Sequence, residues 1–328
     1  MKAILFRKRG LTLVEKPRPR SAPGLALVRV LVAGICRTDI ELWSGYYNFE
    51  GVAGHEFVGV VEEAPGRENL VGRRVTADIN IGCGGCDECR RGNHRHCPDR
   101  RVIGLKGWDG AFAEYLVAPA ANLYLVEDDL GDREAVLAEP LAAALRIADQ
   151  VEITPDLRMA VLGDGKLGML AALALRPLNP GLVLIGRHEN RLALARDLGL
   201  STETVTLEED PPAAARRLGA FDLVVEATGR SEGISYALAL VRPEGTIMLK
   251  TTSHQPSKVN LAEAAVREIK IIGSRCGDLG RALAFLKERT FDPARLIEKI
   301  YPFPEFPLAF QHARRPGAGK VLVDFPPP

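Results

Sequence analysis

From about residue 132, the sequence alternates between segments with helical spacing and short apolar runs. The helical segments are DREAVLAEPLAAALRIADQ (132–150), where Pro140 opens a new turn, KLGMLAALALRP (166–177), and NRLALARDLG (190–199), which Gly199 closes. The apolar runs are MAVLG (159–163), LVLIG (182–186) and FDLVVEATG (221–229), and the alternation continues through SEGISYALALVRPEG, TIMLKTT and VREIKIIGS. Strands alternating with helices of this length predict an α/β fold with a doubly wound parallel sheet, covered by helices on both faces.

The residues before about 126 have a different pattern. Short β-like runs, LALVRVLVAGI (25–35), HEFVGVVEEA (55–64), RRVTADI (73–79) and FAEYLVA (112–118), are separated by Gly, Pro and Asn. They predict a barrel or sandwich with long loops. After residue 274, LGRALAFLKER and GKVLVDF indicate a helix and a final strand that returns to the first domain. We expect domains over 1–139 and 140–273, with 274–328 rejoining the first.

Composition narrows the functional classes. The chain has 328 residues, 46% hydrophobic and 26% charged, with a formal net charge of +1. With a net charge this close to zero, the chain has no excess of positive charge that would favour binding to nucleic acid or to an anionic membrane. The N-terminal segment has charges where a secretory signal has its apolar core, so we expect a cytoplasmic protein. In a reducing compartment, clustered cysteines indicate metal or redox chemistry rather than disulfides.

Four of the six cysteines lie in CGGCDECRRGNHRHC, within a lobe of residues 82–98. Cys83, Cys86, Cys89 and Cys97 have the spacing C-x2-C-x2-C-x7-C, and four thiolates suit a closed, tetrahedral structural Zn²⁺ site. An iron–sulfur cluster is an alternative because Pro98 follows the last cysteine, although its usual spacing is shorter. His94 or His96 as substitute ligands, or a nucleic-acid-binding zinc ribbon, are further alternatives.

A glycine-rich loop, VLGDGKLG, follows the first strand of the alternating region. Gly163, Gly165 and Gly168 form G-x-G-x-x-G at the start of a helix, where Lys166 and Leu167 open the first turn. The first glycine permits the tight turn, the second lets backbone approach a pyrophosphate, and the third lets helix pack on strand. The loop therefore predicts dinucleotide binding.

The end of the second strand bears on which dinucleotide is bound. A fold selective for NAD usually carries Asp or Glu there, but this chain has Gly186, Arg187 and His188, with Arg191 following. The missing carboxylate removes repulsion toward a 2′-phosphate, which a guanidinium can bind in bidentate fashion. We expect NADP to be preferred over NAD, against the alternative that Arg187 is a solvated residue at a helix start.

Another candidate metal set stands in AGICRTDIELWSG and VAGHEFVGVVEE. Cys36, His55 and Glu56 are each unremarkable alone, since a single Cys or His is usually structural. Together with the motifs above, and with GAFAEY, EPLA, VVEATG and GKVLVDF in the same order, they resemble the zinc-containing medium-chain dehydrogenase/reductase family of alcohol, polyol and threonine dehydrogenases. The resemblance covers nearly the whole chain and implies a GroES-like β-barrel catalytic domain with a Rossmann domain.

The resemblance also implies the site. Cys36 and His55 would bind a catalytic zinc, Glu56 would be a neighbouring, sometimes exchanging ligand, and Glu139 would be the third ligand, as in polyol dehydrogenases. Zinc would acidify a bound alcohol, whose alkoxide then transfers hydride to nicotinamide. By the same resemblance, Thr38 would be the first proton carrier and Asp39 would orient His55. In liver-type alcohol dehydrogenases the proton relay that begins at this hydroxyl ends at a histidine. This chain has Glu41 at that place, so either Glu41 or water would complete the proton relay.

We therefore expect a dehydrogenase with two zinc ions per chain that oxidises a secondary alcohol or polyol, assembled as a homodimer or homotetramer as in the family. Two alternatives are a zinc-independent quinone or alkene reductase of the same superfamily and a nucleotide-binding protein without turnover. Trp43, Phe49 and Trp108 are candidate walls of a substrate cleft, and Cys276 is interpreted as structural. Nothing in the sequence identifies the alcohol.

Overall fold

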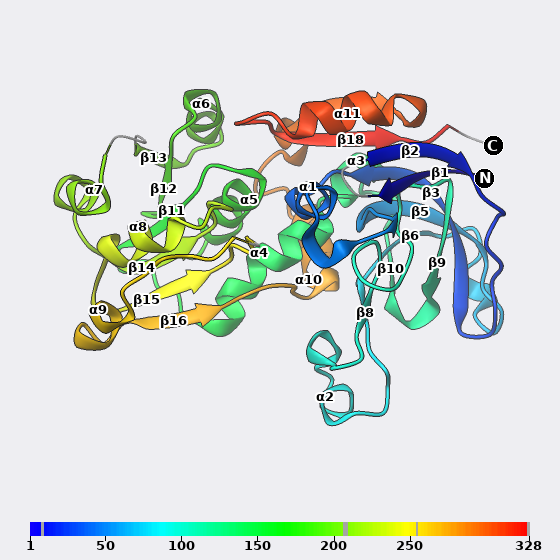
Figure 1. The fold of residues 1–328 in the computed structure, drawn as a ribbon, viewed down its shortest axis with the longest axis horizontal. Coiled ribbons are helices and arrows are strands. Elements are labelled where there is room, and N and C mark those ends of the chain that lie inside the picture. The colour runs from blue at the N-terminus through cyan, green and yellow to red at the C-terminus, as the bar shows by residue number, and fades with distance from the viewer. Residues whose placement is uncertain (8–9, 206–208, 254, 327–328) are drawn as a thin grey trace. The chain divides into compact units, whose positions relative to one another are not determined.

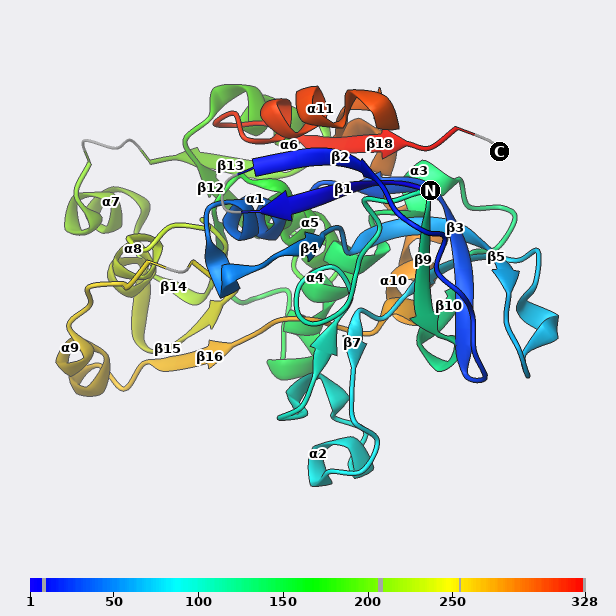
Figure 2. The same ribbon diagram turned by 45° about the vertical axis from the view of Figure 1, so that its right-hand side comes forward.

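The computed structural model describes residues 1–7, 10–205, 209–253 and 255–326. The chain divides into two compact units, which we call the first unit (Met1–Glu139 with Leu279–Pro328) and the second unit (Pro140–Asp278). Figures 1 and 2 show the elements of each unit from two directions. Within the described ranges, no helix has the length and apolar character needed to cross a membrane.

The first unit is built mainly from β-strands. They are β1 (Lys2–Arg7), β2 (Gly10–Glu15), β3 (Leu25–Gly34), β4 (Gly51–Val52), β5 (Glu56–Glu63), β6 (Arg74–Ala77), β7 (Asn80–Ile81), β8 (Arg101–Val102), β9 (Tyr115–Pro119), β10 (Leu123–Leu125), β17 (Ile297–Pro302) and β18 (Lys320–Asp324). The largest sheet has the order β10-β6-β5-β3-β18-β17, with β9 also pairing β3, and β2-β1-β4 and β7-β8 form smaller sheets. The long, Val- and Leu-rich β3 is the centre of this arrangement because three strands pair with it.

Short helices connect these strands: α1 (Arg37–Trp43), α2 (Asp87–Arg90), α3 (Asp132–Ala135), α10 (Leu279–Lys287) and α11 (Phe306–Ala313). A cluster of aromatic side chains fills the core, with Phe6, Phe112, Phe306 and Phe310 fully buried. The C-terminal β18 pairs antiparallel with β3, and Leu322 lies opposite Gly34. The last strand of the chain is therefore part of the first unit's main sheet.

The second unit is an α/β sheet. Its strands are β11 (Met159–Leu162), β12 (Val183–Gly186), β13 (Ser201–Thr204), β14 (Phe221–Glu226), β15 (Val241–Leu249) and β16 (Lys270–Gly273), and its helices are α4 (Ala138–Gln150, which begins in the first unit), α5 (Lys166–Leu175), α6 (Glu189–Asp197), α7 (Pro211–Leu218), α8 (Gly233–Leu240) and α9 (Leu261–Val266). The strand order is β13-β12-β11-β14-β15-β16, and every neighbouring pair is parallel. The predicted doubly wound parallel sheet is confirmed.

Two prolines explain where the elements differ from their sequence patterns. The predicted helical segment 132–150 consists of α3 and α4, with Pro140 in the first turn of α4, where its missing N–H has no partner to lose. In SEGISYALALVRPEG the helix ends at Leu240 and Val241 is already extended. A residue before proline is disfavoured in helical conformation, so the approach of Pro243 favours the early change to strand.

Candidate active site and metal centres

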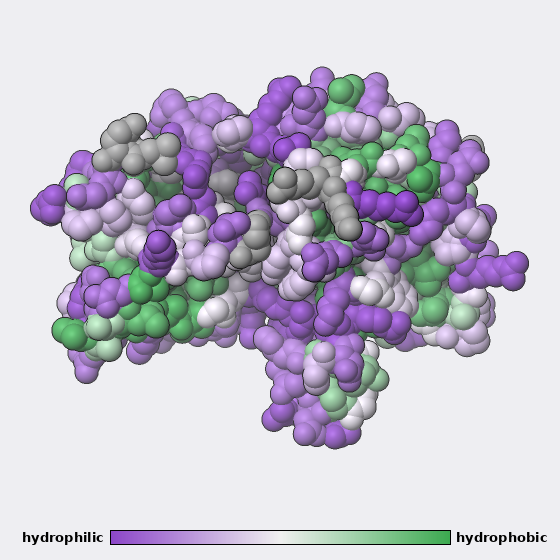
Figure 3. All heavy atoms as spheres, in the orientation of Figure 1, coloured by the Kyte–Doolittle hydropathy of each residue, from purple (hydrophilic) through white to green (hydrophobic). Residues whose placement is uncertain are grey.

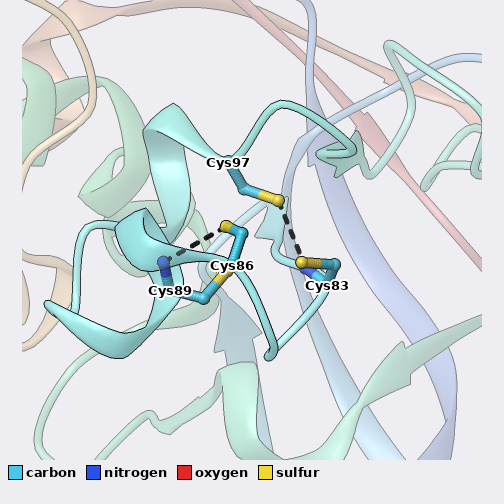
Figure 4. A group of neighbouring side chains, drawn as sticks. All are labelled: Cys83, Cys86, Cys89 and Cys97. Carbon is cyan, nitrogen blue, oxygen red and sulfur yellow. Dashed lines mark hydrogen bonds between the residues drawn. The ribbon is translucent and has the colours of Figure 1, made fainter.

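The four cysteines of the lobe converge on one point. Their Sγ atoms all lie within 4.8 Å of one another, and Figure 4 shows the side chains turned toward a common centre. Cys86 caps the short helix α2 and accepts a hydrogen bond from the N–H of Cys89 (3.4 Å), while the Cys97 sulfur accepts from the N–H of Cys83 (3.4 Å). Gly84 and Gly92 have positive φ, at 78° and 74°, which lets the backbone curl around the thiols.

This lobe fits a tetrahedral zinc ion. A Zn–S bond of ~2.3 Å implies sulfurs about 3.8 Å apart, within the observed limit. All four cysteines are free thiols rather than disulfides. Hydrogen bonds from the N–H groups of Gly85 and Cys86 lower the pKa of Cys83 to about 7, which favours the thiolate that a metal needs. His94 does not join the sulfurs: its Nε2 lies 2.8 Å from Asp78 Oδ2.

A second group of metal-ligating side chains lies where β3 ends and β5 begins. We call Cys36, His55 and Glu56 the catalytic cluster; one ligand atom from each lies within 4.8 Å of the others. The antiparallel register sets Glu56 opposite Gly34, so the chain after β3 and the chain before β5 meet at the same edge. Gly34 is required here because a Cβ would lie 2.4 Å from Glu56 Oε2.

Asp39 supports this cluster from the first turn of α1. It is fully buried; its Oδ2 accepts the N–H of Cys36 (2.8 Å), and its Oδ1 lies 3.3 Å from His55 Nδ1, within ion-pair distance but outside hydrogen-bonding geometry. Burial alone lowers the pKa of His55, but the negative charges of Asp39 and Cys36 outweigh it and raise that pKa well above its ordinary value. Asp39 thus fixes both the backbone of Cys36 and the environment of the His55 ring.

Glu56 has a buried cationic partner that the sequence analysis missed. Lys320, at the start of β18, places its Nζ against Glu56 Oε2, and both side chains are almost completely buried. Burial lowers the pKa of Lys320, but the carboxylate of Glu56 more than compensates and raises it. No local pattern signals this pair, because Lys320 precedes an ordinary apolar strand. Only the pairing of β18 with β3 brings it to the cluster.

Glu139 stands apart from the three close ligands. It lies in the first turn of α4, partly buried, and its carboxylate is not in the group within 4.8 Å. Burial raises its pKa to about 7; His55 opposes this rise and Glu56 adds to it, so Glu139 lies within electrostatic reach of both. The structure therefore brings together Cys36, His55 and Glu56, with Glu139 within electrostatic reach but outside the group of ligand atoms that lie within 4.8 Å of one another.

Two further expected site residues lie on α1. Thr38 Oγ1 is 3.7 Å from Cys36 Sγ. Glu41 pairs with Arg37 one turn earlier, accepting from its Nε at 2.9 Å. The hydroxyl of Thr38 is thus adjacent to the catalytic cluster, whereas Glu41 is engaged by a guanidinium on the same helix.

The three aromatic candidates for a substrate wall have different surroundings. Phe49 and Trp108 line a hollow of ≈ 460 Å³ in the first unit, together with Tyr47, Asn48, Glu50 and residues 105–107 and 109. Trp108 is held there by its indole N–H, which donates to the carbonyl of Val117 (2.7 Å). Trp43 instead packs against Phe310, with the guanidinium of Arg314 over its ring.

The three glycines of the glycine-rich loop have different surroundings. Gly163 has φ +119°, and a Cβ there would lie 2.6 Å from the carbonyl oxygen of Ala227. A Cβ on Gly168 would lie 1.8 Å from the carbonyl oxygen of Gly163. A Cβ on Gly165 would meet nothing within 4 Å, so no contact within the protein demands glycine at the N-cap of α5. Open space above a helix N-terminus that begins at Lys166 and Leu167 fits a pyrophosphate.

A residue that the sequence analysis did not select lies against the end of β12. Asp164, inside the glycine-rich loop, is buried, and its carboxylate accepts the N–H groups of Arg187 (2.9 Å) and His188 (2.7 Å). Arg191, buried on α6, donates from Nε to the carbonyl of Asp164 (3.3 Å). The available sequence signal for Asp164 was a charged residue inside the glycine-rich motif.

Family models match both units. The model described as alcohol dehydrogenase GroES-like domain matches residues 22–128, and the one described as zinc-binding dehydrogenase matches residues 167–288. The chain is 31% identical to the L-threonine 3-dehydrogenase of Streptomyces avermitilis, over 99% of each protein. It is 32% identical to the D-altritol 5-dehydrogenase of Agrobacterium fabrum, over 93% of this chain and 94% of that protein.

Solved structures share the fold. An alcohol dehydrogenase from Escherichia coli CFT073, complexed with NADH, superposes with a TM-score of 0.90 at 26% identity, over 99% of both chains. A zinc-binding dehydrogenase from Sinorhizobium meliloti 1021, bound to NADP, has a TM-score of 0.87 at 27% identity, over 98% of both chains. These neighbours, together with the family models, confirm the predicted combination of a GroES-like domain and a Rossmann domain.

Proposed function

We propose that this chain, which belongs to the zinc-containing medium-chain dehydrogenase/reductase family, transfers hydride between a secondary alcohol or polyol and a nicotinamide cofactor. The observation that carries the proposal is the catalytic cluster, in which Cys36, His55 and Glu56 converge, with the buried Asp39 beside Cys36 and His55. The names of the relatives, an L-threonine 3-dehydrogenase and a D-altritol 5-dehydrogenase, support a hydroxyl on a secondary carbon as the reacting group.

The residues of the cluster have separate tasks. Cys36 and His55 would hold a zinc ion, with Glu139 or Glu56 as the further ligand; when bound, zinc supplies a Lewis acid that lowers the pKa of the alcohol. Asp39 faces His55 Nδ1 and so leaves Nε2 as the ring nitrogen for the metal. Lys320 neutralises Glu56 and holds its carboxylate toward β18, which favours Glu139 as the ligand in the resting site.

Proton transfer starts at Thr38. Its hydroxyl oxygen, 3.7 Å from Cys36 Sγ, takes the proton that the alcohol releases. The carboxylate of Glu41 is turned toward the guanidinium of Arg37 on the same helix, with 2.9 Å between Arg37 Nε and Glu41 Oε1. The proton therefore passes from Thr38 to water rather than to Glu41.

The cysteine lobe would hold a second, structural zinc. Four thiols leave no coordination position for substrate, so this ion would stabilise the lobe and take no part in the reaction. Cys83, Cys86, Cys89 and Cys97 are its ligands in this proposal.

The preferred cofactor is NADP. Gly186 provides no carboxylate at the end of β12, and Arg187 follows with a guanidinium that can pair with a 2′-phosphate. The glycine-rich loop and the N-terminus of α5 would bind the pyrophosphate. A tenfold or greater preference for NADPH in kcat/KM is expected, whereas an equal preference for NADH contradicts the assignment.

The assembly is a homo-oligomer built on the edge strand β16. Apolar side chains are exposed on and beside it: Leu261 (63%), Val266 (85%) and Ile271 (38%). Figure 3 shows apolar surface over α9 and β16. An unpaired strand edge beside exposed apolar residues favours pairing with a second copy of the chain. Light scattering after size-exclusion chromatography is expected to show a dimer or tetramer, and Val266→Asp is expected to yield monomer.

Oxidation of an alcohol panel tests the function. Purified protein is assayed with NADP or NAD against simple secondary alcohols, polyols and L-threonine, before and after chelation and with Cys36→Ser as the variant lacking a ligand. We expect turnover with at least one secondary alcohol that is lost on chelation and in Cys36→Ser. Activity toward quinones or activated alkenes that survives chelation would favour the zinc-independent reductase instead, and NADPH binding without turnover would favour a non-catalytic protein.

A further inference from the structure

Asp164 occupies the space in which NAD-selective folds place their acidic residue. A Cβ built on Gly186 would lie 2.5 Å from both Cβ and Oδ2 of Asp164. An acid at position 186 and the observed Asp164 therefore exclude each other. In this chain a carboxylate from the glycine-rich loop, 22 positions earlier in the sequence, fills the space beside Gly186 at the end of β12.

The carboxylate of Asp164 is engaged by the protein itself. Oδ2 accepts the N–H groups of Arg187 (2.9 Å) and His188 (2.7 Å), and His188 Nδ1 lies 3.0 Å from Oδ1 and 3.2 Å from Oδ2. Only 5% of the residue is exposed. Buried Arg191 holds the backbone of Asp164 in place by donating to its carbonyl. Three donors from a two-residue turn thus converge on one fixed carboxylate.

Two roles for such a carboxylate make opposite predictions. In one, Asp164 accepts a hydrogen bond from the 2′-hydroxyl of the adenosine ribose, which favours NAD and repels a 2′-phosphate. In the other, Asp164 caps the turn after β12 and sets the direction of the Arg187 and His188 side chains. The contacts favour the second role, because both oxygens already accept donors from that turn.

We propose that Asp164 is a positioning residue that holds Arg187 and His188 in the arrangement that binds the 2′-phosphate of NADP. This inference rests on the NADP preference proposed above and names a residue on which that preference depends. Asp164 makes no contact with the phosphate; it acts by fixing the turn, whose backbone and imidazole it binds. The ring of His188, with Nδ1 3.0 Å from Oδ1, also occupies the side of the carboxylate that Arg187 leaves open.

Calorimetric titration of the purified enzyme with adenosine 2′,5′-bisphosphate and with 5′-AMP tests this directly, since the two probes differ only in the 2′-phosphate. For the wild type we expect the bisphosphate to bind about tenfold or more tightly than AMP. Asp164→Ala is expected to weaken bisphosphate binding about tenfold while AMP changes by less than about threefold. In kinetics, KM for NADPH rises and kcat is retained, because the reacting groups are untouched.

Matched variants separate geometry from charge. Asp164→Asn keeps an oxygen acceptor for the turn and is expected to retain most of the bisphosphate preference. Glu189→Ala removes an exposed neighbouring acid that pairs with Arg196, and it is expected to leave the preference unchanged. If Asp164→Ala folds poorly, the paired exchange Asp164→Gly with Gly186→Asp restores the acid to the strand end and is expected to reverse the preference toward AMP and NADH.

The outcomes distinguish this inference from the proposed function. A wild type that binds both probes equally overturns the NADP preference and, with it, this inference. A wild type that prefers the bisphosphate while Asp164→Ala keeps that preference overturns the inference alone. Tighter bisphosphate binding by Asp164→Ala would show that the carboxylate repels phosphate, and equal loss of both probes would show a general loop defect; each overturns the positioning role.

Discussion

Replacing Lys320 by Met tests whether Lys320 compensates the buried negative charge of Glu56 in the catalytic cluster. Glu56 and Lys320 expose 1% and 4% of their side chains. Removing the cation leaves a buried carboxylate without compensation, which costs about 3–5 kcal/mol in proteins. For a folding unit of this size, that loss lowers the melting temperature by roughly 6–20 °C.

The assay is thermal unfolding near neutral pH at one scan rate, with the zinc content of each variant measured. The matched control is Lys287→Met, since Lys287 pairs with Asp129 at 3.4 Å but both side chains are well exposed, at 40% and 63%. That variant should lose less than about 1 kcal/mol. The double variant Glu56→Gln/Lys320→Met removes both charges and is expected to recover more than half of the loss. A Lys320→Met variant as stable as the control, or a double variant no more stable than Lys320→Met, would refute the reasoning.

Three further predictions concern the second unit. Gly168→Ala is expected to abolish NADPH binding and lower the melting temperature, because its Cβ would overlap the preceding turn. Gly165→Ala should weaken NADPH binding with little change in melting temperature. Fluorescence titration measures the binding of each variant, and calorimetry measures its melting temperature. Arg242, and then the backbone N–H of Arg158, lower the pKa of Asp222, so its stabilisation is present above the unfolded pKa of ~3.9 and is lost as pH falls through the folded value. Asp222→Asn should therefore cost about 1 kcal/mol near neutral pH and little at an acidic pH below the folded pKa, as denaturant melts at both pH values would show. Arg267 donates to the carbonyls of Leu238 and Val241, in and just after the last turn of α8, and Arg267→Ala should lower the free energy of unfolding by about 1–3 kcal/mol in the same melts.

Much of the second unit could be predicted from the sequence because its signals are local. Apolar runs such as MAVL and the spacing of KLGMLAALAL report strand and helix directly. The glycine-rich loop is equally local, since all three glycines lie within six positions, between the end of β11 and the first turn of α5. The strand β17 and helix α11 were not predicted, because prolines interrupt their short patterns.

The site was predictable only as far as its motifs extend. Cys36, His55 and the four lobe cysteines belong to recognisable patterns, and the structure brings each set together. Lys320 and Asp164 were missed because their roles depend on contacts between distant segments: β18 against β3, and the glycine-rich loop against the end of β12. The residues next to Lys320 give no sign of its pairing, and the charge of Asp164 inside a glycine-rich motif marks the residue without showing its partner.

The metal content of the purified protein tests the central claim most directly. The division into a structural lobe and a catalytic cluster predicts two zinc ions per chain by elemental mass spectrometry. Cys36→Ser should retain one zinc and lose activity with little change in melting temperature, and Cys89→Ser should retain one zinc and mainly lose stability. One zinc per wild-type chain, or equal destabilisation by the two substitutions, would contradict the assignment of a catalytic zinc to Cys36, His55 and their carboxylate partners.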